Sequence, residues 1–229
     1  MKFGIIAAME EELKTLLLAL EEKNEVVVLG KTYYQGSIGQ HEVVLVQSGI
    51  GKVMSAMSVA ILAETFAVDT IINTGSAGAV AHGLAIGDVV IADRLVYHDV
   101  DVTAFGYAFG QMAGQELYYQ ADRTLMARLQ KVLNQQGIHN HVGLIAPGDS
   151  FIAGPDKVAA IKGHFPEVLA VEMEGAAVAQ AAQAAGKPFL VIRAMSDTAQ
   201  GDANITFDEF VVEAGKRSAN TLLTLLTSY

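Results

Sequence analysis

The sequence places acidic residues shortly after three stretches that predict buried strands. They are Glu12 after Phe3–Ala8, Glu172 and Glu174 after Leu169–Val171, and Asp197 after Phe189–Ala194. In open α/β sheets the carboxyl ends of the strands meet at one crevice, so these carboxylates are expected to converge there. Converging carboxylates without histidine ligands beside them predict acid and base catalysis on a neutral or cationic transition state.

Each carboxylate also has a simpler interpretation, which the residues alone leave open. Glu12 follows two other glutamates and could only complement the N-terminus of a helix. Glu174 could do the same for the next helix, and Asp197 could be a cap or turn residue. The predicted convergence of all three on one crevice is what favours a reacting site.

Arg193 stands within an otherwise apolar predicted strand, where an unpaired charge is costly. It either forms a structural ion pair with one of the carboxylates, or orients a carboxylate or a water molecule at the strand end. The two roles are compatible with each other.

Two glycine-containing segments are suited to a flat ligand. Thr74–Gly78 follows the strand Thr70–Asn73, and its small residues would let the backbone approach a ligand closely; a plain tight turn is the alternative. Phe151 and Ile152 follow Gly148–Ser150. An aromatic ring there can stack on a planar base while the neighbouring backbone reads the base edge, with core packing as the alternative.

Apolar runs and helical periodicity alternate along the chain. We predict strands at Phe3–Ala8, Val26–Leu29, Thr32–Ile38, Glu42–Gln47, Thr70–Asn73, Asp88–Tyr97, His141–Ala146, Leu169–Val171 and Phe189–Ala194. We predict helices at Glu10–Glu22, Lys52–Phe66, Arg123–Gln136, Pro155–Gly163, Glu174–Ala185 and Phe207–Leu226, and loops at Gly75–Gly87 and His98–Gln115. This order predicts an α/β fold with three αβα layers and a central mixed, mostly parallel twisted sheet, whose short early strands suggest curling towards a barrel.

Length and composition bound the class of protein. The 229 residues contain no linker or repeat and predict a single domain, 1–229. Lys plus Arg number 15 against 25 Asp plus Glu, and this net charge of −10 excludes a basic surface for nucleic acid or an anionic membrane. Cysteine is absent, and no apolar run reaches the roughly 20 residues of a membrane span, so we expect a cytoplasmic protein.

Familiar cofactor and nucleophile motifs fail on inspection. Gly49–Lys52 resembles the end of a phosphate loop, but Val46 and Val53 stand where that loop needs glycine and Ser or Thr. The pattern around Ser76 is no nucleophile elbow, because Thr74 replaces its first glycine. The six histidines lack the helical spacing of a zinc site, so neither a metal nor a cofactor is expected.

Short segments spread over nearly the whole chain, taken in order, carry a family resemblance. They are Gly4–Glu12, Gln47–Val53, Ile71–Gly78, Tyr97–Tyr107, Gly148–Ile152, Ala170–Glu174, Arg193–Asp197 and Phe207–Phe210. Together they resemble the bacterial 5′-methylthioadenosine/S-adenosylhomocysteine nucleosidases, within the nucleoside phosphorylase superfamily. The resemblance implies a nucleoside phosphorylase-like fold, a homodimer, and hydrolysis of small adenine nucleosides by water, without a metal or cofactor.

The resemblance also implies a role for each matching residue. Glu12 is expected to be the general base that activates water, Asp197 the general acid that protonates adenine N7, and Glu174 the partner of the ribose hydroxyls. Ser76 and Arg193 are expected to support Glu12, and Ser196 to support Asp197. Met173 is expected to pack on the sugar, Phe151 and Ile152 to bind adenine, and Met9, Ile50 and Phe207 to line the 5′-thio pocket. Gly78 and Glu172 are expected to line the rest of the site, and Phe105 and Tyr107 of the partner subunit to close it.

Three alternatives remain open at this point. A phosphorylase of the same superfamily would need a cationic phosphate site, whereas Glu12 would repel phosphate and Arg193 is the only obvious cation. A hydrolase of a related nucleoside, such as a futalosine-type substrate, would use the same residues. A nucleoside-binding protein without turnover is disfavoured by the intact Glu12, Glu174 and Asp197.

Overall fold

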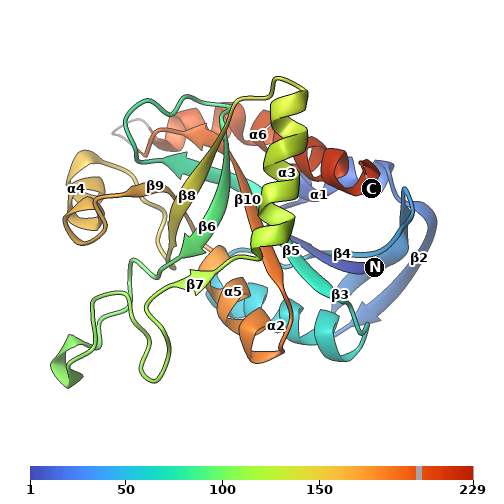
Figure 1. The fold of residues 1–229 in the computed structure, drawn as a ribbon, viewed down its shortest axis with the longest axis horizontal. Coiled ribbons are helices and arrows are strands. Elements are labelled where there is room, and N and C mark those ends of the chain that lie inside the picture. The colour runs from blue at the N-terminus through green and yellow to red at the C-terminus, as the bar shows by residue number, and fades with distance from the viewer. Residues whose placement is uncertain (200–202, 229) are drawn as a thin grey trace.

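The chain alternates strands and helices over the part that the computed structural model describes, which is residues 1–199 and 203–228, without the side chains of 203–206 and 208 (Figure 1). The strands are β1 (Lys2–Ala7), β2 (Glu21–Val28), β3 (Lys31–Ile38), β4 (His41–Gln47), β5 (Thr70–Ala79), β6 (Val89–Leu95), β7 (Tyr119–Gln120), β8 (Asn140–Pro147), β9 (Val168–Glu172) and β10 (Phe189–Asp197). The helices are α1 (Glu10–Leu18), α2 (Lys52–Glu64), the short 3₁₀ turn η1 (Thr103–Phe105), α3 (Arg123–Gln135), α4 (Pro155–His164), α5 (Gly175–Ala184) and α6 (Ala203–Thr227).

The strands form one mixed sheet around a parallel centre. Strands β4, β1, β5 and β10 run parallel side by side, and β3 and β2 continue antiparallel beyond β4. On the other side the sheet closes on itself, because the path β10–β6–β8–β9 returns to β5. The αβα class is therefore confirmed. The predicted curling is found among the late strands, while the early strands β2–β4 form an open wing.

Helices cover both faces of the parallel centre. Helices α1, α3 and α6 pack on one face, and α2 and α5 pack on the other (Figure 1). Strand β1 alternates between them, with Phe3 and Ile5 in the core below α1 and Ile6 in the core below α2. Burial on both faces is the physical reason that this strand reads as a continuous apolar run.

The predicted helix Glu10–Glu22 is wrong at its end. Helix α1 stops at Leu18, and Glu21 already pairs with Ser37 in the antiparallel ladder of β2 and β3. Residues 19–22 are good helix formers, but sheet pairing overrides this local preference. The charged residues that begin β2 lie on a sheet edge, where charges discourage pairing with other chains.

The predicted loop Gly75–Gly87 is also wrong at its start. Strand β5 continues through these glycines as far as Ala79, and β10 continues through Asp197 rather than ending at Ala194. Gly75 and Gly78 are therefore strand residues, which pair with Arg193 and Asp197 of β10.

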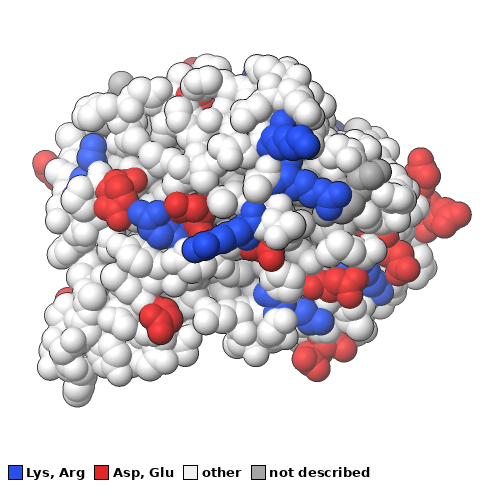
Figure 2. All heavy atoms as spheres, in the orientation of Figure 1, with Lys and Arg blue, Asp and Glu red and all other residues white. Residues whose placement is uncertain are grey.

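Residues 98–118 form an arm that extends from the body of the molecule at the lower left of Figure 1. It is a loop apart from η1, as predicted, and Phe105 on it is 81% exposed. On the face in Figure 2, several basic side chains follow one another across the middle, with acidic side chains beside them. None of the helices in the described residues is long and apolar enough to cross a membrane.

Candidate active site

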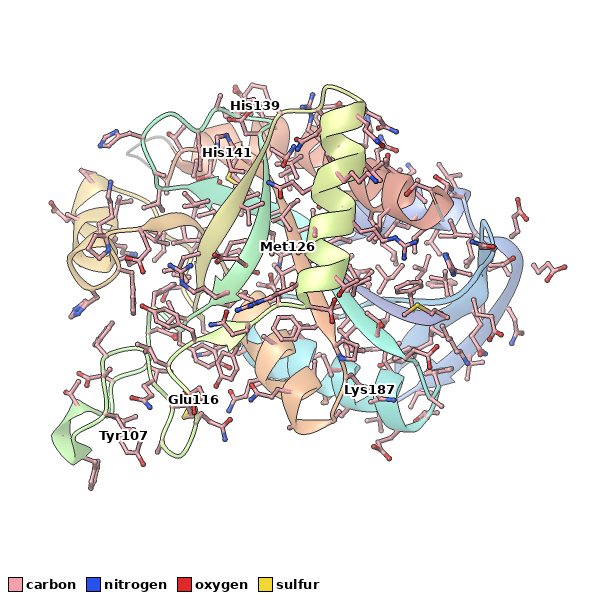
Figure 3. All side chains as sticks on the ribbon, viewed as in Figure 1. Tyr107, Glu116, Met126, His139, His141 and Lys187 are labelled. Carbon is pink, nitrogen blue, oxygen red and sulfur yellow. The ribbon has the colours of Figure 1, made fainter. Side chains whose placement is uncertain are left out.

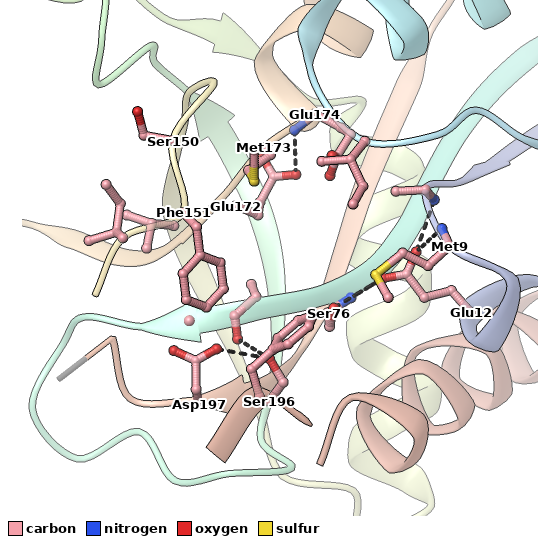
Figure 4. A pocket seen from close by; sticks show the side chains of 17 residues that line it. Met9, Glu12, Ser76, Ser150, Phe151, Glu172, Met173, Glu174, Ser196 and Asp197 are labelled. Carbon is pink, nitrogen blue, oxygen red and sulfur yellow. Dashed lines mark hydrogen bonds between the residues drawn. The ribbon is translucent and has the colours of Figure 1, made fainter. Parts of the chain in front are cut away.

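The ends of β1, β5, β9 and β10 surround a pocket of about 260 Å³ (Figure 4). Most of the residues predicted from the sequence line it. They are Met9, Glu12, Ile50, Ser76, Gly78, Phe151, Ile152, Glu172, Met173, Glu174, Ser196, Asp197 and Phe207. The predicted convergence of the three acidic sites is thus found in the structure.

Glu12 is the third residue of α1, and four donors hold its carboxylate. Oε2 accepts hydrogen bonds from the backbone N–H groups of Ala8 at 2.9 Å and Met9 at 3.1 Å. Oε1 accepts from the backbone N–H of Ser76 at 2.9 Å and from the Ser76 hydroxyl at 3.0 Å. Helix α6 packs closely behind, since a Cβ on Gly215 would lie 3.2 Å from Glu12 Cα. The Glu12 side chain therefore caps the N-terminus of its own helix. The same contacts fix its carboxylate at the pocket wall, where it can accept a proton.

Asp197 ends β10 just after a β-bulge, which shifts the strand register between Met195 and Asp197. Such bulges re-aim side chains next to sites. Asp197 Oδ1 accepts from the backbone N–H of Ala199 at 2.8 Å, and the Ser196 hydroxyl donates to Oδ2 at 3.0 Å. Burial raises the pKa of Asp197, and these two hydrogen bonds oppose the rise. A buried carboxyl that keeps its proton to higher pH is suited to be a general acid.

The glycines of β5 make room for both carboxylates. A Cβ on Gly75 would lie 2.7 Å from Glu12 Oε1 and 2.7 Å from Arg193 Nη1. A Cβ on Gly78 would lie 2.8 Å from Asp197 Oδ1. Side-chain atoms do not approach so closely, so the two acids can stand against this strand only because these positions are glycine.

Glu174 stands immediately before α5 and reaches across to the start of α2. Its Oε1 accepts a hydrogen bond from the backbone N–H of Gly51 at 2.9 Å. Gly51 has a φ of 97°, which favours glycine, and the segment Gly49–Lys52 serves this contact rather than a phosphate loop. Burial and the neighbouring Glu172 raise the pKa of Glu174, while Arg193 lowers it.

Arg193 is buried behind the pocket and pairs with Glu172 at the end of β9 and Glu174 just before α5. Its Nη2 donates to Asn73 Oδ1 at 2.5 Å, forms a salt bridge with Glu172, and lies 3.6 Å from Glu174 Oε2. This is the structural ion pair weighed above, and it also positions Glu174. Among the described residues, no hydrogen bond or salt bridge joins Arg193 to Glu12, but the charge of Glu12 helps to raise the pKa of Arg193.

Aromatic side chains form the other wall of the pocket. The rings of Phe151 and Phe207 meet edge to face with centroids 5.5 Å apart, and Phe151 is 41% exposed. Phe105 and Tyr107 do not line this pocket, because they lie on the arm (Figure 3 labels Tyr107). Asp208, next to Phe207 in the matching motif, has its side chain outside the described residues.

The pocket also contains residues to which the sequence analysis gives no role. They are Ala8, Ala77, Ser150 and Val171. Each adjoins a predicted residue, so the strand ends themselves are the signal for them. Asn73, the partner of Arg193, also escapes prediction; its signal in the sequence is an amide side chain directly after an apolar run.

Comparison with known proteins identifies the class to which this fold and site belong. Residues 2–227 match the model of the phosphorylase superfamily, and the chain belongs to that superfamily. Within it, the chain belongs to the 5′-methylthioadenosine/S-adenosylhomocysteine nucleosidases, a family of N-glycosyl hydrolases, as the resemblance predicted.

The similarity extends over the full length of the relatives. The nucleosidase of Geobacillus thermodenitrificans is 47% identical over 228 residues, which cover 99% of this chain and 97% of the relative. The Streptococcus pyogenes S-adenosylhomocysteine nucleosidase, solved with 5-methylthiotubericidin, is 67% identical with a TM-score of 0.98, covering 100% of this chain and 97% of the other. The S. pneumoniae enzyme, solved with the transition-state inhibitor MT-ImmA, is also 67% identical, with a TM-score of 0.97 and 99% of both chains covered.

Proposed function

We propose that the protein hydrolyses the N-glycosidic bond of 5′-methylthioadenosine and S-adenosylhomocysteine, releasing adenine and the thioribose. One observation carries the proposal: a pocket holds a fixed acceptor carboxylate, Glu12, and a buried carboxyl with a raised pKa, Asp197. Ser76 binds the first and Gly78 adjoins the second, two positions apart on β5. Two residues of a strand span about 7 Å, which leaves room for a sugar and a water molecule.

Asp197 protonates the leaving group. Breaking the bond between ribose C1′ and the base leaves an electron pair on adenine, and a proton delivered to N7 neutralises it. Burial favours the protonated form of Asp197 before the step, and the Ser196 hydroxyl and Ala199 N–H stabilise the carboxylate after it. The ribose passes through an oxocarbenium-like state of positive charge.

Glu12 activates the nucleophile. Its carboxylate takes a proton from water as the water oxygen bonds to C1′, so adenine gains one proton and the sugar gains a hydroxyl. Attack from the face opposite the base inverts the configuration at C1′. Glu174 hydrogen-bonds the ribose hydroxyls and so holds the sugar in place for the attack.

The remaining pocket residues hold the substrate in place. Phe151 stacks on adenine, the Ile152 backbone reads its edge, and Met173 packs on the sugar. The 5′-thio group lies among apolar side chains, which are Met9, Ile50 and Phe207. These assignments follow the roles that the family resemblance implies, and their support is that all six residues line the one pocket.

The electrostatics favour water over phosphate as the nucleophile. Arg193, the cation that a phosphate would need, is buried and paired with Glu172. Glu12 adds negative charge beside the attack position. The relatives' names favour a methylthioadenosine-type substrate over a futalosine-type one.

The protein is further proposed to be a cytoplasmic homodimer in which Phe105 and Tyr107 of the partner subunit close the site. An 81% exposed phenylalanine on a projecting arm supports this, because large exposed apolar groups mark interaction sites. Mixed dimers test it: one chain carries Phe105→Ala and the other Glu12→Gln. A shared site leaves one complete active site per mixed dimer, whereas separate sites leave none, and loss of all activity on mixing would overturn the proposal.

Adenine release from 5′-methylthioadenosine, with and without phosphate, tests the main proposal. We expect release in phosphate-free buffer with free methylthioribose as the second product. Release only with phosphate, giving a sugar 1-phosphate, would make the protein a phosphorylase. Asp197→Asn is the control: it should still bind substrate but lose about 10²–10⁴-fold in turnover.

A further inference from the structure

A second cluster of ionisable side chains lies outside the pocket. Asp88 precedes β6, His139 precedes β8, and His141 belongs to β8. One ligand atom from each lies within 4.8 Å of the other two. Figure 3 shows the two histidines close together near the start of β8. None of the three lines the pocket that holds Glu12 and Asp197.

The distance from each histidine to Asp88 is close to that between two ligands of one ion. His139 Nδ1 lies 3.3 Å from Asp88 Oδ1, and His141 Nε2 lies 3.6 Å from Asp88 Oδ2. A tetrahedral zinc ion with bonds of about 2.0–2.2 Å to nitrogen and oxygen separates its ligands by about 3.4 Å. The two imidazole rings stand at 82° with centroids 4.8 Å apart, so they approach the carboxylate from different directions.

One nitrogen of the cluster, His141 Nε2, has no hydrogen-bond partner among the described residues. It is also shielded from solvent. Its 3.6 Å distance from Asp88 is longer than a hydrogen bond. A shielded imidazole nitrogen needs a partner, and a cation between the two groups supplies one. Asp88 is already oriented for this, since its Oδ2 accepts from the Ala85 backbone N–H at 2.9 Å.

The types of ligand select the class of ion. Two imidazoles and one carboxylate suit zinc and its divalent transition-metal neighbours, whereas magnesium and calcium prefer oxygen alone. His139 is exposed and lines a surface hollow with Gly87, Met195 and Arg217. His139 therefore forms the solvent-facing side of the cluster.

We propose that Asp88, His139 and His141 bind one divalent transition-metal ion, with zinc as the first candidate. The ion takes no part in the hydrolysis and would join the turn before β6 to the start of β8. The site also adjoins the acid-bearing strand, because the Met195 N–H donates to the Asp88 carbonyl at 2.9 Å and the Gly87 N–H donates to the Met195 carbonyl at 2.8 Å.

Calorimetric titration of the metal-stripped full chain with zinc sulfate tests the proposal. We expect one ion per chain, undisturbed by millimolar magnesium. His141→Gln and His139→Gln should each weaken binding at least about tenfold, because even residues that only orient metal ligands have effects of that size. His82→Gln, which removes an exposed histidine elsewhere, is the matched control and should bind as the natural chain does.

Cobalt provides a second readout, since its visible absorption reports on its ligands. We expect a saturable visible band that is lost in both histidine variants and kept in His82→Gln. Circular dichroism of the metal-free variants checks their folding. If His141→Gln fails to fold, the test rests on His139→Gln, because His139 is exposed. Absence of zinc binding by the natural chain at millimolar concentration, or unchanged binding by a folded His139→Gln, would overturn the site.

Discussion

Gly78 lies opposite Asp197 in the register of β5 and β10, and a Cβ on it would stand 2.8 Å from Asp197 Oδ1. The acid is thus held against bare backbone. Its position depends on a residue that has no side chain and takes no part in the chemistry.

Replacing Gly78 by alanine should displace the Asp197 carboxyl and lower kcat by about tenfold or more, since a small misplacement of a reacting group is costly. The matched control is Gly163→Ala in α4, where a Cβ meets nothing within 4 Å. That control should keep full activity and gain about 0.5–1 kcal/mol in free energy of unfolding, because alanine favours helix. Equal kcat in both variants would contradict the crowding argument.

Substitutions of Glu12 and Ser76 should lower turnover by very different factors. Glu12→Gln removes the base and should lower kcat by about 10²–10⁴-fold. Ser76→Ala removes only the hydroxyl bond of 3.0 Å and keeps the backbone one, so we expect a loss of about 3–10-fold, as for one hydrogen bond. Steady-state kinetics on both variants decide this. A loss in Ser76→Ala as large as in Glu12→Gln would mean that the hydroxyl itself reacts.

The raised pKa of Asp197 should appear in the pH dependence of stability. The folded state holds this proton more tightly than the unfolded state, so its contribution to the free energy of unfolding falls as pH rises from about 3.9 towards the native pKa. Asp197→Asn removes this pH-dependent loss of stability, because asparagine has no proton to release. Urea denaturation across this range should therefore show the variant gaining stability relative to the natural chain as pH rises. A difference that does not change with pH would show that burial does not perturb this carboxyl.

Arg193 should be among the most sensitive positions for stability. Arg193→Met leaves Glu172 and Glu174 buried without their cation, and we expect a loss of about 3–5 kcal/mol in free energy of unfolding. Lys216→Met is the control, since its pair with Glu213 is exposed and such pairs contribute at most about 1 kcal/mol. Similar urea midpoints for the two variants would show that the buried pair contributes little.

The sequence predicts the acidic site well, because the rule behind it is topological. Apolar runs followed by Glu12, Glu174 and Asp197 place the acids at strand ends, and parallel strands bring those ends together. The αβα layers follow from the same alternation. Neither prediction requires knowledge of the tertiary contacts of a helix or strand.

The errors occur where a distant neighbour decides the local structure. Glycines usually interrupt strands, yet Gly75 and Gly78 belong to β5 because they pair with β10. The two carboxylates then occupy the space that their side chains would need. Residues 19–22 favour helix, but Glu21 finds a pairing partner in Ser37 of β3. The cluster of Asp88 with His139 likewise joins residues far apart in the chain, and no local spacing reveals it.

The place of β10 in the sheet has a consequence for biosynthesis. This strand is central, between β5 and β6, although it follows both of them in the chain by about a hundred residues or more. Until Phe189–Asp197 emerges, the nascent chain carries two facing strand edges with no partner, one of them on the apolar β5. Unpaired edges invite association between chains. The sheet of the earlier strands therefore cannot be completed until β10 has been synthesised, and the unpaired edges are exposed to association between chains in the interval before β10 docks.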